Sequence, residues 1–259
     1  MAEQGAGPVW LVVPAHGRPE VSKVAFAGLA WMRDRLAQCG YEAEVCVVAC
    51  DENLALAEHE GFRTLDRPNT ELGRRWNDGY EYAAGQGAGY LMPCGSDDWV
   101  HPELVLNMIH HHVELGPKKA KTMVCTRASC AVAPDGSEIC TLHIPYQGGD
   151  GIRLMPAALL AQVGYRPAAD ERNRAIDGSI SDKLAKYGGV QYSYLATDEV
   201  DPLYIVDFKS DGTQITDYKR LAEAYTDTLV TDVWGALGGL YPSYLLERAQ
   251  GLYKVRAAA

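Results

Sequence analysis

Apolar and polar residues are arranged in blocks along the first hundred positions, and these blocks predict strands and helices in turn. The apolar run at 9–13 predicts a buried strand that Pro14 stops, and the run at 43–50 predicts a second one. Between them, residues 21–39 carry apolar side chains at helical spacing and end before Gly40, which predicts an amphipathic helix.

The same alternation continues as far as residue 94. A short helix at 53–60 precedes a brief strand at 62–65, and Thr70 is expected to cap the next helix. The run YLMPC at 90–94 predicts a fourth strand. Because strands alternate with helices from the start, the sequence predicts an α/β fold with a mainly parallel, mixed sheet and helices on both faces.

The pattern changes after the helix expected at 102–115. Residues 122–144 predict an antiparallel hairpin whose two strands are joined by a Pro-Asp-Gly turn at 134–136. Short helices are expected at 154–164 and 180–187, and strands at 191–196 and 203–208. From residue 217 onward the chain is predicted to be mostly helical, so we expect one domain at 1–215 followed by a helical C-terminal appendage at 216–259.

Charge and composition narrow the class of protein. The formal net charge of −10 provides no global basic field for holding a polyanion, which argues against high-affinity nucleic-acid binding. No apolar run approaches the roughly 20 residues of a membrane span, and the N-terminus lacks the layout of a secretion signal. The seven cysteines have no ligand-like spacing. Together these features predict a cytoplasmic protein with reduced thiols.

Polar residues follow the ends of three predicted strands. Arg18 follows the first, Asp51 the second, and the adjacent Asp97 and Asp98 the fourth. Carboxyl ends of parallel strands meet at one edge of a sheet, where ligands bind in such folds. Adjacent carboxylates repel each other, and a hard divalent cation removes that cost because it prefers oxygen ligands. Capping of the helix at Pro102 is the alternative use of these acids, but it needs only one of them.

The spacing around these acids resembles the core signature of nucleotide-sugar glycosyltransferases of the GT-A fold, in the inverting, family-2-like group. The resemblance covers about residues 9–190, and its specific part is 69–104. Gly95 departs from the pattern, since the family has an acid there, and Trp76 stands where the family has an arginine. The matching residues in the specific part are Asn69, Asn77, Gly79, Ala83, Gly85, Asp97, Asp98, Trp99 and Pro102.

The resemblance implies a nucleotide-sugar half at about 9–104 and an acceptor half at about 105–215. It implies a divalent metal, Mn²⁺ or Mg²⁺, held by Asp97 with Asp98 as its second ligand or supporting residue. The donor would be a UDP-, GDP- or TDP-sugar. Arg18, Arg67, Arg74 or Arg75 could add positive charge beside its diphosphate. The residues expected to contact the donor are Pro14, His16, Arg18, Asp51, Arg67, Asn77, Ser96 and Asp97.

The resemblance also implies a general base at the start of a helix in the second half of the chain. Asp177 matches it, with Asp170, Glu171 and Asp182 as rivals. The base would take the proton of the acceptor hydroxyl during an inverting transfer. In this fold a late residue, often histidine, completes the metal or phosphate site, and this chain offers Asp207 and Lys209 in its place.

Two other functions share the same expected fold. A sugar-phosphate nucleotidylyltransferase would have a glycine-rich loop after the first strand, but this chain has a single glycine before Arg18. A catalytically silent nucleotide-sugar-binding protein would explain the departures at Gly95 and Trp76. If the chain is a glycosyltransferase, the acceptor hydroxyl is open to three classes: a glycan, a protein side chain or a hydroxylated DNA base.

Overall fold

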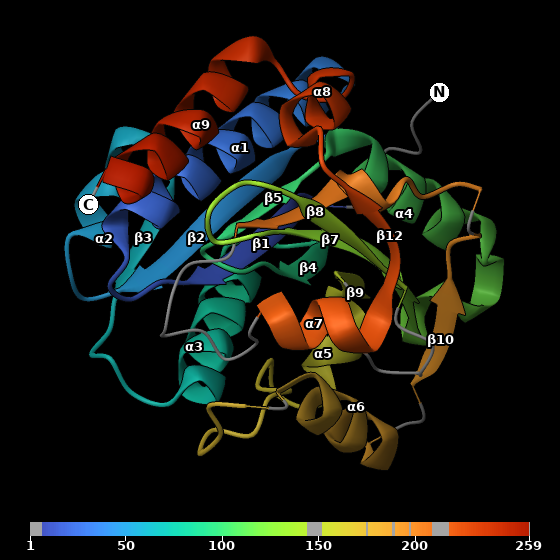
Figure 1. Ribbon diagram of the computed structural model, residues 1–259. Coiled ribbons are helices and arrows are strands. Elements are labelled where there is room, and N and C mark those ends of the chain that lie inside the picture. The colour runs from blue at the N-terminus through green and yellow to red at the C-terminus, as the bar shows by residue number, and fades with distance from the viewer. Residues whose placement is uncertain are drawn as a thin grey trace.

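The computed structural model describes residues 7–143, 152–174, 176–187, 190–196, 198–208 and 218–258 (Figure 1). Its larger sheet has seven strands in the order β10-β6-β9-β4-β1-β2-β3. Strand β9 runs antiparallel to both of its neighbours, and the other strand pairs are parallel. The strands are β1 (Val9–Pro14), β2 (Ala43–Ala49), β3 (Arg63–Asp66), β4 (Tyr90–Pro93), β6 (Thr122–Cys125), β9 (Arg153–Pro156) and β10 (Gln191–Tyr194).

A second sheet of five strands, in the order β12-β8-β7-β11-β5, lies beside the first. It is antiparallel except where β11 pairs with β7. Its strands are β5 (Asp98–Val100), β7 (Ala128–Val132), β8 (Ile139–His143), β11 (Ile205–Phe208) and β12 (Thr226–Val230). The predicted mixed α/β fold with a mainly parallel sheet is therefore confirmed, with a smaller sheet added to it.

Helices cover both faces of the larger sheet. Alternate residues of β1 point to opposite sides, so that Leu11 packs toward α1, α2 and α4 while Val12 packs toward α3, α5 and α6. Figure 1 shows α3, α5 and α6 together on one side of the sheet. These helices are α1 (Pro19–Gln38), α2 (Asn53–His59), α3 (Leu72–Gly85), α4 (Pro102–Glu114), α5 (Ala157–Ala161) and α6 (Ile176–Lys186).

The C-terminal region packs on the second sheet and on α1. Helix α9 lies along α1 in Figure 1, and both helices contribute to a core that surrounds the fully buried Trp99 of β5. Gly28 of α1 makes this packing possible, because a Cβ there would lie 2.1 Å from the Trp99 ring. The remaining elements are α7 (Tyr218–Tyr225), α8 (Val233–Gly238), α9 (Ser243–Ala258) and the 3₁₀ helices η1 (Gly116–Lys121) and η2 (Pro202–Tyr204).

Several predicted elements differ from the observed ones. The hairpin turn at 134–136 is correct, but it joins β7 to β8, and β6 belongs to the larger sheet. Helix α3 begins after Glu71 rather than at Thr70, and α6 begins four residues before Ile180. The segment at 216–259, which was predicted to be mostly helical, contains the helices α7, α8 and α9 and in addition strand β12, which pairs with β8.

In the part of the chain that the structure describes, no helix combines the length and the apolar character that crossing a membrane requires.

Candidate metal and nucleotide site

Three carboxylates converge where β4 leads into the second sheet. Asp97 and Asp98 follow β4, and Asp207 lies on β11 directly opposite Asp98 in the β5–β11 pairing. The backbone N–H of Phe208 also donates to the carbonyl of Asp97 at 2.9 Å, which holds the two segments in register. One oxygen of each carboxylate lies within 4.8 Å of the others, and all three side chains are half-buried.

This arrangement fits a hard divalent cation. The donor set consists only of carboxylate oxygens, the ligand class that Mg²⁺ and Mn²⁺ prefer. The spread of the three oxygens, at most 4.8 Å, is close to the span of two metal–oxygen bonds of about 2.1 Å each. Asp97, Asp98 and Asp207 could therefore hold one ion together. Asp207 is one of the two residues that the sequence offered in place of the family's late histidine.

At position 95, where the family has an acid, the glycine packs against two of the three carboxylates. A Cβ on Gly95 would lie 2.6 Å from Oδ2 of Asp98 and 2.8 Å from Oδ1 of Asp97. The Gly95 N–H also donates to Oδ2 of Asp98 at 2.8 Å. The glycine thus leaves room for the two carboxylates and orients one of them, so the departure from the family pattern belongs to the geometry of the carboxylate cluster.

Arg18 connects the first strand to this cluster. Its guanidinium lies 3.0 Å from Oδ2 of Asp97. Arg18 has a φ of 48°, and Gly17 before it has a φ of 60°. A left-handed conformation is uncommon for a residue with a side chain and is often kept at functional sites. Here the left-handed backbone at Gly17 and Arg18 directly precedes α1 and directs the Arg18 guanidinium toward the carboxylates.

A second polar cluster lies after β2. Oδ2 of Asp51 accepts from the Gly17 N–H at 2.7 Å and lies 3.2 Å from Nδ1 of the exposed His16. Oδ1 of Asp51 accepts from the backbone and side-chain amides of Asn53. Burial acts to raise the pKa of Asp51, but the bonds from Gly17 and Asn53 outweigh it and leave that pKa lowered. Asp51 is therefore held as an anion that ties the loop after β1 to the loop after β2.

Arg75 lies beneath this second cluster. It is 9% exposed, and its Nη1 donates to the carbonyl of Ala15 at 3.3 Å. Burial lowers its pKa, and the neighbouring Cys50 and Asp51 act in the opposite direction. Its Nε is buried and has no hydrogen-bond partner among the described residues. The adjacent Arg74 is exposed, so Arg75 is the arginine of this pair that belongs to the candidate site.

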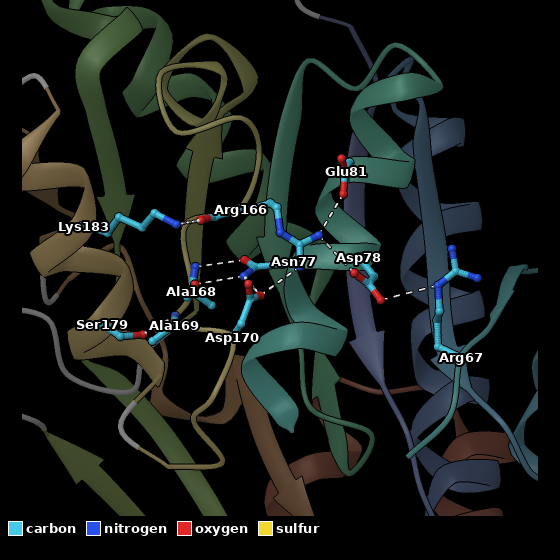
Figure 2. Close-up of polar contacts among 10 residues, drawn as sticks. All are labelled: Arg67, Asn77, Asp78, Glu81, Arg166, Ala168, Ala169, Asp170, Ser179 and Lys183. Carbon is cyan, nitrogen blue, oxygen red and sulfur yellow. Dashed lines mark hydrogen bonds and ion pairs between the residues drawn. The ribbon is translucent and has the colours of Figure 1, made fainter. Parts of the chain in front are cut away.

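Arg67 and Asn77 occupy a polar network on the side of α3 away from the sheet (Figure 2). Asn77 is fully buried, and its amide bonds the N–H and the carbonyl of Ala168 and the carboxylate of Asp170. Arg67 contacts Asp78, which also binds Arg166. Asn77 therefore joins α3 to the segment at 166–170, while Arg67 joins α3 to the end of β3. Their predicted contacts with the donor remain predictions.

The same network continues to α6. The Nζ of Lys183 donates to the carbonyl of Arg166 at 2.6 Å, and the Ser179 hydroxyl accepts from the Ala169 N–H at 3.1 Å (Figure 2). Helix α6 carries Asp177 in its first turn. Its side chain and all of Lys209 lie outside the described residues, so their roles remain predictions as well.

Of the other residues predicted to contact the donor, Pro14 is the buried last residue of β1, and Ser96 is buried in the turn between β4 and β5. The structure thus gathers His16, Arg18 and Asp51 at one edge of the sheet with Asp97 and Asp98. Arg75 and Asp207, which the sequence offered as candidates, also lie at this edge, and the structure adds Asn53. Asn53 gave no usable signal in the sequence, because its role depends on the meeting of two loops.

Comparison with known proteins supports the fold. No family model matches the chain, and no curated protein matches it. Among solved structures it is similar to residues 1–349 of S. aureus TarS, with a TM-score of 0.55, 14% identity, and coverage of 78% of this chain and 60% of that chain. The complex of the same protein with UDP gives a TM-score of 0.56, 14% identity and coverage of 78% and 61%.

The complex of TarS with UDP-GlcNAc gives a TM-score of 0.55, 15% identity and coverage of 80% of this chain and 60% of that chain. This chain therefore spans about three fifths of the TarS fragment. At this level of identity the likeness concerns the fold, and the GT-A-type fold expected from the sequence is confirmed.

Proposed function

We propose that this protein is a metal-dependent glycosyltransferase that moves a sugar from a nucleotide-sugar donor to a hydroxyl acceptor. The observation that carries the proposal is the cluster of Asp97, Asp98 and Asp207, placed at a strand-end edge of a GT-A-type fold. The structural relatives from S. aureus, solved with UDP and UDP-GlcNAc, support a nucleotide sugar as the ligand.

The donor would lie across the two polar clusters. Asp97, Asp98 and Asp207 would hold a divalent cation, Mn²⁺ or Mg²⁺, which when bound would supply positive charge to the leaving nucleoside diphosphate. Arg18 would add a guanidinium on the same side, because it already contacts Asp97. Asp51 and Arg75, with His16 above them, would bind the nucleoside end of the donor.

The proposed transfer is a single displacement at the sugar carbon. The bond between the sugar carbon and the diphosphate oxygen breaks, and a new bond forms to the acceptor oxygen. We assign Asp177 as the base that takes the acceptor proton, and a single displacement of this kind inverts the configuration of the sugar carbon. The start of a helix suits this role, since the helix dipole favours an ionised carboxylate there.

Donor turnover tests the proposal. UDP-, GDP- and TDP-sugars are incubated with the protein and Mn²⁺ or Mg²⁺, and release of the nucleoside diphosphate is measured. We expect turnover that chelation abolishes and that Asp97→Asn and Asp207→Asn each lower by about 100-fold or more, because both would lose a ligand charge. Glu114→Gln, which removes one exposed acid from the end of α4, serves as the matched control.

The outcomes separate the proposal from its nearest rival. Absence of both donor binding and donor turnover over the whole panel would contradict it. Metal-dependent donor binding without turnover, on a broad range of acceptors, would instead favour the silent nucleotide-sugar-binding protein.

A further inference from the structure

Arg127 lies two residues after β6 and has no acidic partner among the residues that the structure describes. Its guanidinium carbon lies 4.0 Å from the centroid of the Tyr194 ring on β10, a cation–π contact. Its Nε is buried and has no hydrogen-bond partner in the described part of the chain, and no described acid forms an ion pair with it. A buried donor without a partner costs free energy, which a bound acceptor group would recover.

The local backbone fixes the position of this side chain. The Thr126 N–H donates to the carbonyl of Ile152 at 3.3 Å, and the Thr126 hydroxyl oxygen accepts from the Ala128 N–H at 3.2 Å. On the other side the Leu195 N–H donates to the carbonyl of Cys125 at 3.1 Å. Arg127 is therefore held where the chain passes from the larger sheet to the second one, beside the end of β10.

The sheet topology places Arg127 at the same edge as the candidate metal site. Strands β6 and β4 both run antiparallel to β9, so their carboxyl ends point the same way. The clusters of Arg18 and Asp51 follow β1 and β2, on one side of β4, while Arg127 follows β6 on its other side. The carboxylates after β4 thus lie between the donor residues and Arg127.

Strand pairing within the second sheet sets the distance between Arg127 and the carboxylate cluster. Asp207 is opposite Ala131 in the β7–β11 pairing. Arg127 precedes Ala131 by four residues, which corresponds to about 13 Å along an extended strand. An acceptor that reaches from the metal cluster to Arg127 would therefore carry its second recognised group roughly two sugar rings away from the reacting hydroxyl.

We infer that Arg127, on the Tyr194 ring, binds an oxyanion of the acceptor, a phosphate or a carboxylate. A guanidinium presents a fork of donors that matches both groups, and the ring beneath it fixes the plane of the fork. That the bound molecule is an acceptor rests on the proposed transferase function. Binding of the anion itself does not depend on turnover.

The test compares three sugars that differ in one group: glucose, glucose 6-phosphate and glucuronate. Their dissociation constants are measured by ligand-observed NMR on the full chain with saturating UDP and Mn²⁺. We expect at least one of the anionic sugars to bind about 10-fold more tightly than glucose, as a charge-assisted hydrogen bond implies. Preference for the phosphate or for the carboxylate identifies which group the acceptor carries.

Variants test whether the preference for anionic sugars over glucose depends on Arg127. Arg127→Gln should abolish it, and Arg127→Lys should keep part of it, because the charge remains while the fork is lost. Arg63→Gln is the matched control, since it removes an exposed arginine from β3, at the far end of the same sheet. Should Arg127→Gln fail to fold, Tyr194→Leu tests the same site by removing the ring beneath the guanidinium, and it too should weaken the preference.

Equal affinity for the three sugars, or a preference that survives in Arg127→Gln, would overturn the inference. A failure of the proposed function looks different: UDP neither binds nor is released from a donor, while the preference for anionic sugars and its dependence on Arg127 persist.

Discussion

At the scale of single residues, Gly95 shows how a missing side chain can define a site. Its Cβ position is occupied by the two carboxylates of the cluster. We expect Gly95→Ala to lower the affinity for Mn²⁺ about 10-fold or more, because residues that orient metal ligands typically contribute that much. Isothermal titration with Mn²⁺ measures this.

Gly85→Ala is the control for Gly95→Ala. Gly85 ends α3, and no atom lies within 4 Å of a Cβ built there. The control should keep wild-type affinity for Mn²⁺. Equal affinities in the two variants would show that the carboxylates move aside easily and that Gly95 has no part in orienting them.

Arg75 and Arg74 are adjacent arginines with opposite surroundings. Arg75 is buried beside Asp51, whereas Arg74 is exposed. Arg75→Gln should weaken UDP binding by about 10-fold or more, because it removes a cation that little water screens. Arg74→Gln should change it less than about 3-fold, as expected for an exposed charge. Equilibrium titration with UDP and Mn²⁺ compares the two, and an equal effect would contradict the assignment of Arg75 to the donor site.

The sequence predicted the acidic and basic members of the site better than its neutral ones. Arg18, Asp51, Asp97 and Asp98 follow strand ends, a position that apolar runs reveal. For Asp207 the sequence offered a role only together with Lys209, in place of the family's late histidine. Its position beside Asp98 depends on the pairing of β11 with β5, which are separated by about a hundred residues.

At the scale of elements, two short strands that form through long-range pairing were not predicted from the sequence. Strand β5 has three residues and lies between the carboxylates and α4, so no periodic pattern marks it. Strand β12 is stabilised by pairing with β8 across more than eighty residues. Apolar periodicity reports a segment's burial, and it says little about which strands a short segment will pair with.

The network that joins α3 to α6 also belongs to this scale. Oδ1 of Asp170 accepts from Asn77 at 2.7 Å and from Arg166 at 2.9 Å (Figure 2). Burial acts to raise the pKa of Asp170, but the bonds from Asn77 and Arg166 outweigh it and leave that pKa lowered. A lowered folded-state pKa means that the unfolded chain binds more protons, so stability is lost as pH falls.

We therefore expect Asp170 to contribute to stability above its unfolded pKa of about 3.9 and to lose that contribution as pH falls through its lower folded value. Asp170→Asn should flatten the acid side of the stability profile, measured as the free energy of unfolding in urea from pH 6 to pH 3. At pH 6 the variant should lose about 1 kcal/mol of the free energy of unfolding, because the Asp170 carboxylate is partly exposed and screened. Asp34→Asn, an exposed acid paired with one arginine on α1, should leave the slope unchanged.

At the scale of the whole molecule, the C-terminal region is part of the support of the candidate metal site. The ring of Tyr241, which follows α8, lies 5.0 Å from that of Trp99, the residue after Asp98. The Tyr241 hydroxyl donates to the carbonyl of Leu203 at 2.8 Å. Leu203 lies in η2, which leads directly into β11 and Asp207. His101 adds a further contact, since its Nε2 lies 3.2 Å from the carbonyl of Leu240.

This arrangement predicts that a change in the C-terminal region affects both stability and metal affinity. Tyr241→Phe keeps the ring and removes one hydrogen bond to a carbonyl beside β11. We expect it to lower the free energy of unfolding by about 1 kcal/mol and to weaken Mn²⁺ binding at the same time, because β11 carries one of the three carboxylates. Urea unfolding and Mn²⁺ titration measure the two effects on the full chain.

Tyr244→Phe provides the comparison, because Tyr244 is 49% exposed and lies three residues away. It should match the wild type in both measurements. If Tyr241→Phe lowers stability but leaves Mn²⁺ affinity unchanged, the C-terminal region packs on the fold without positioning the carboxylates. A change in both quantities means that the segments around Asp98 and Asp207 depend on residues more than thirty positions further along the chain, so that the candidate site depends on the packing of the whole molecule.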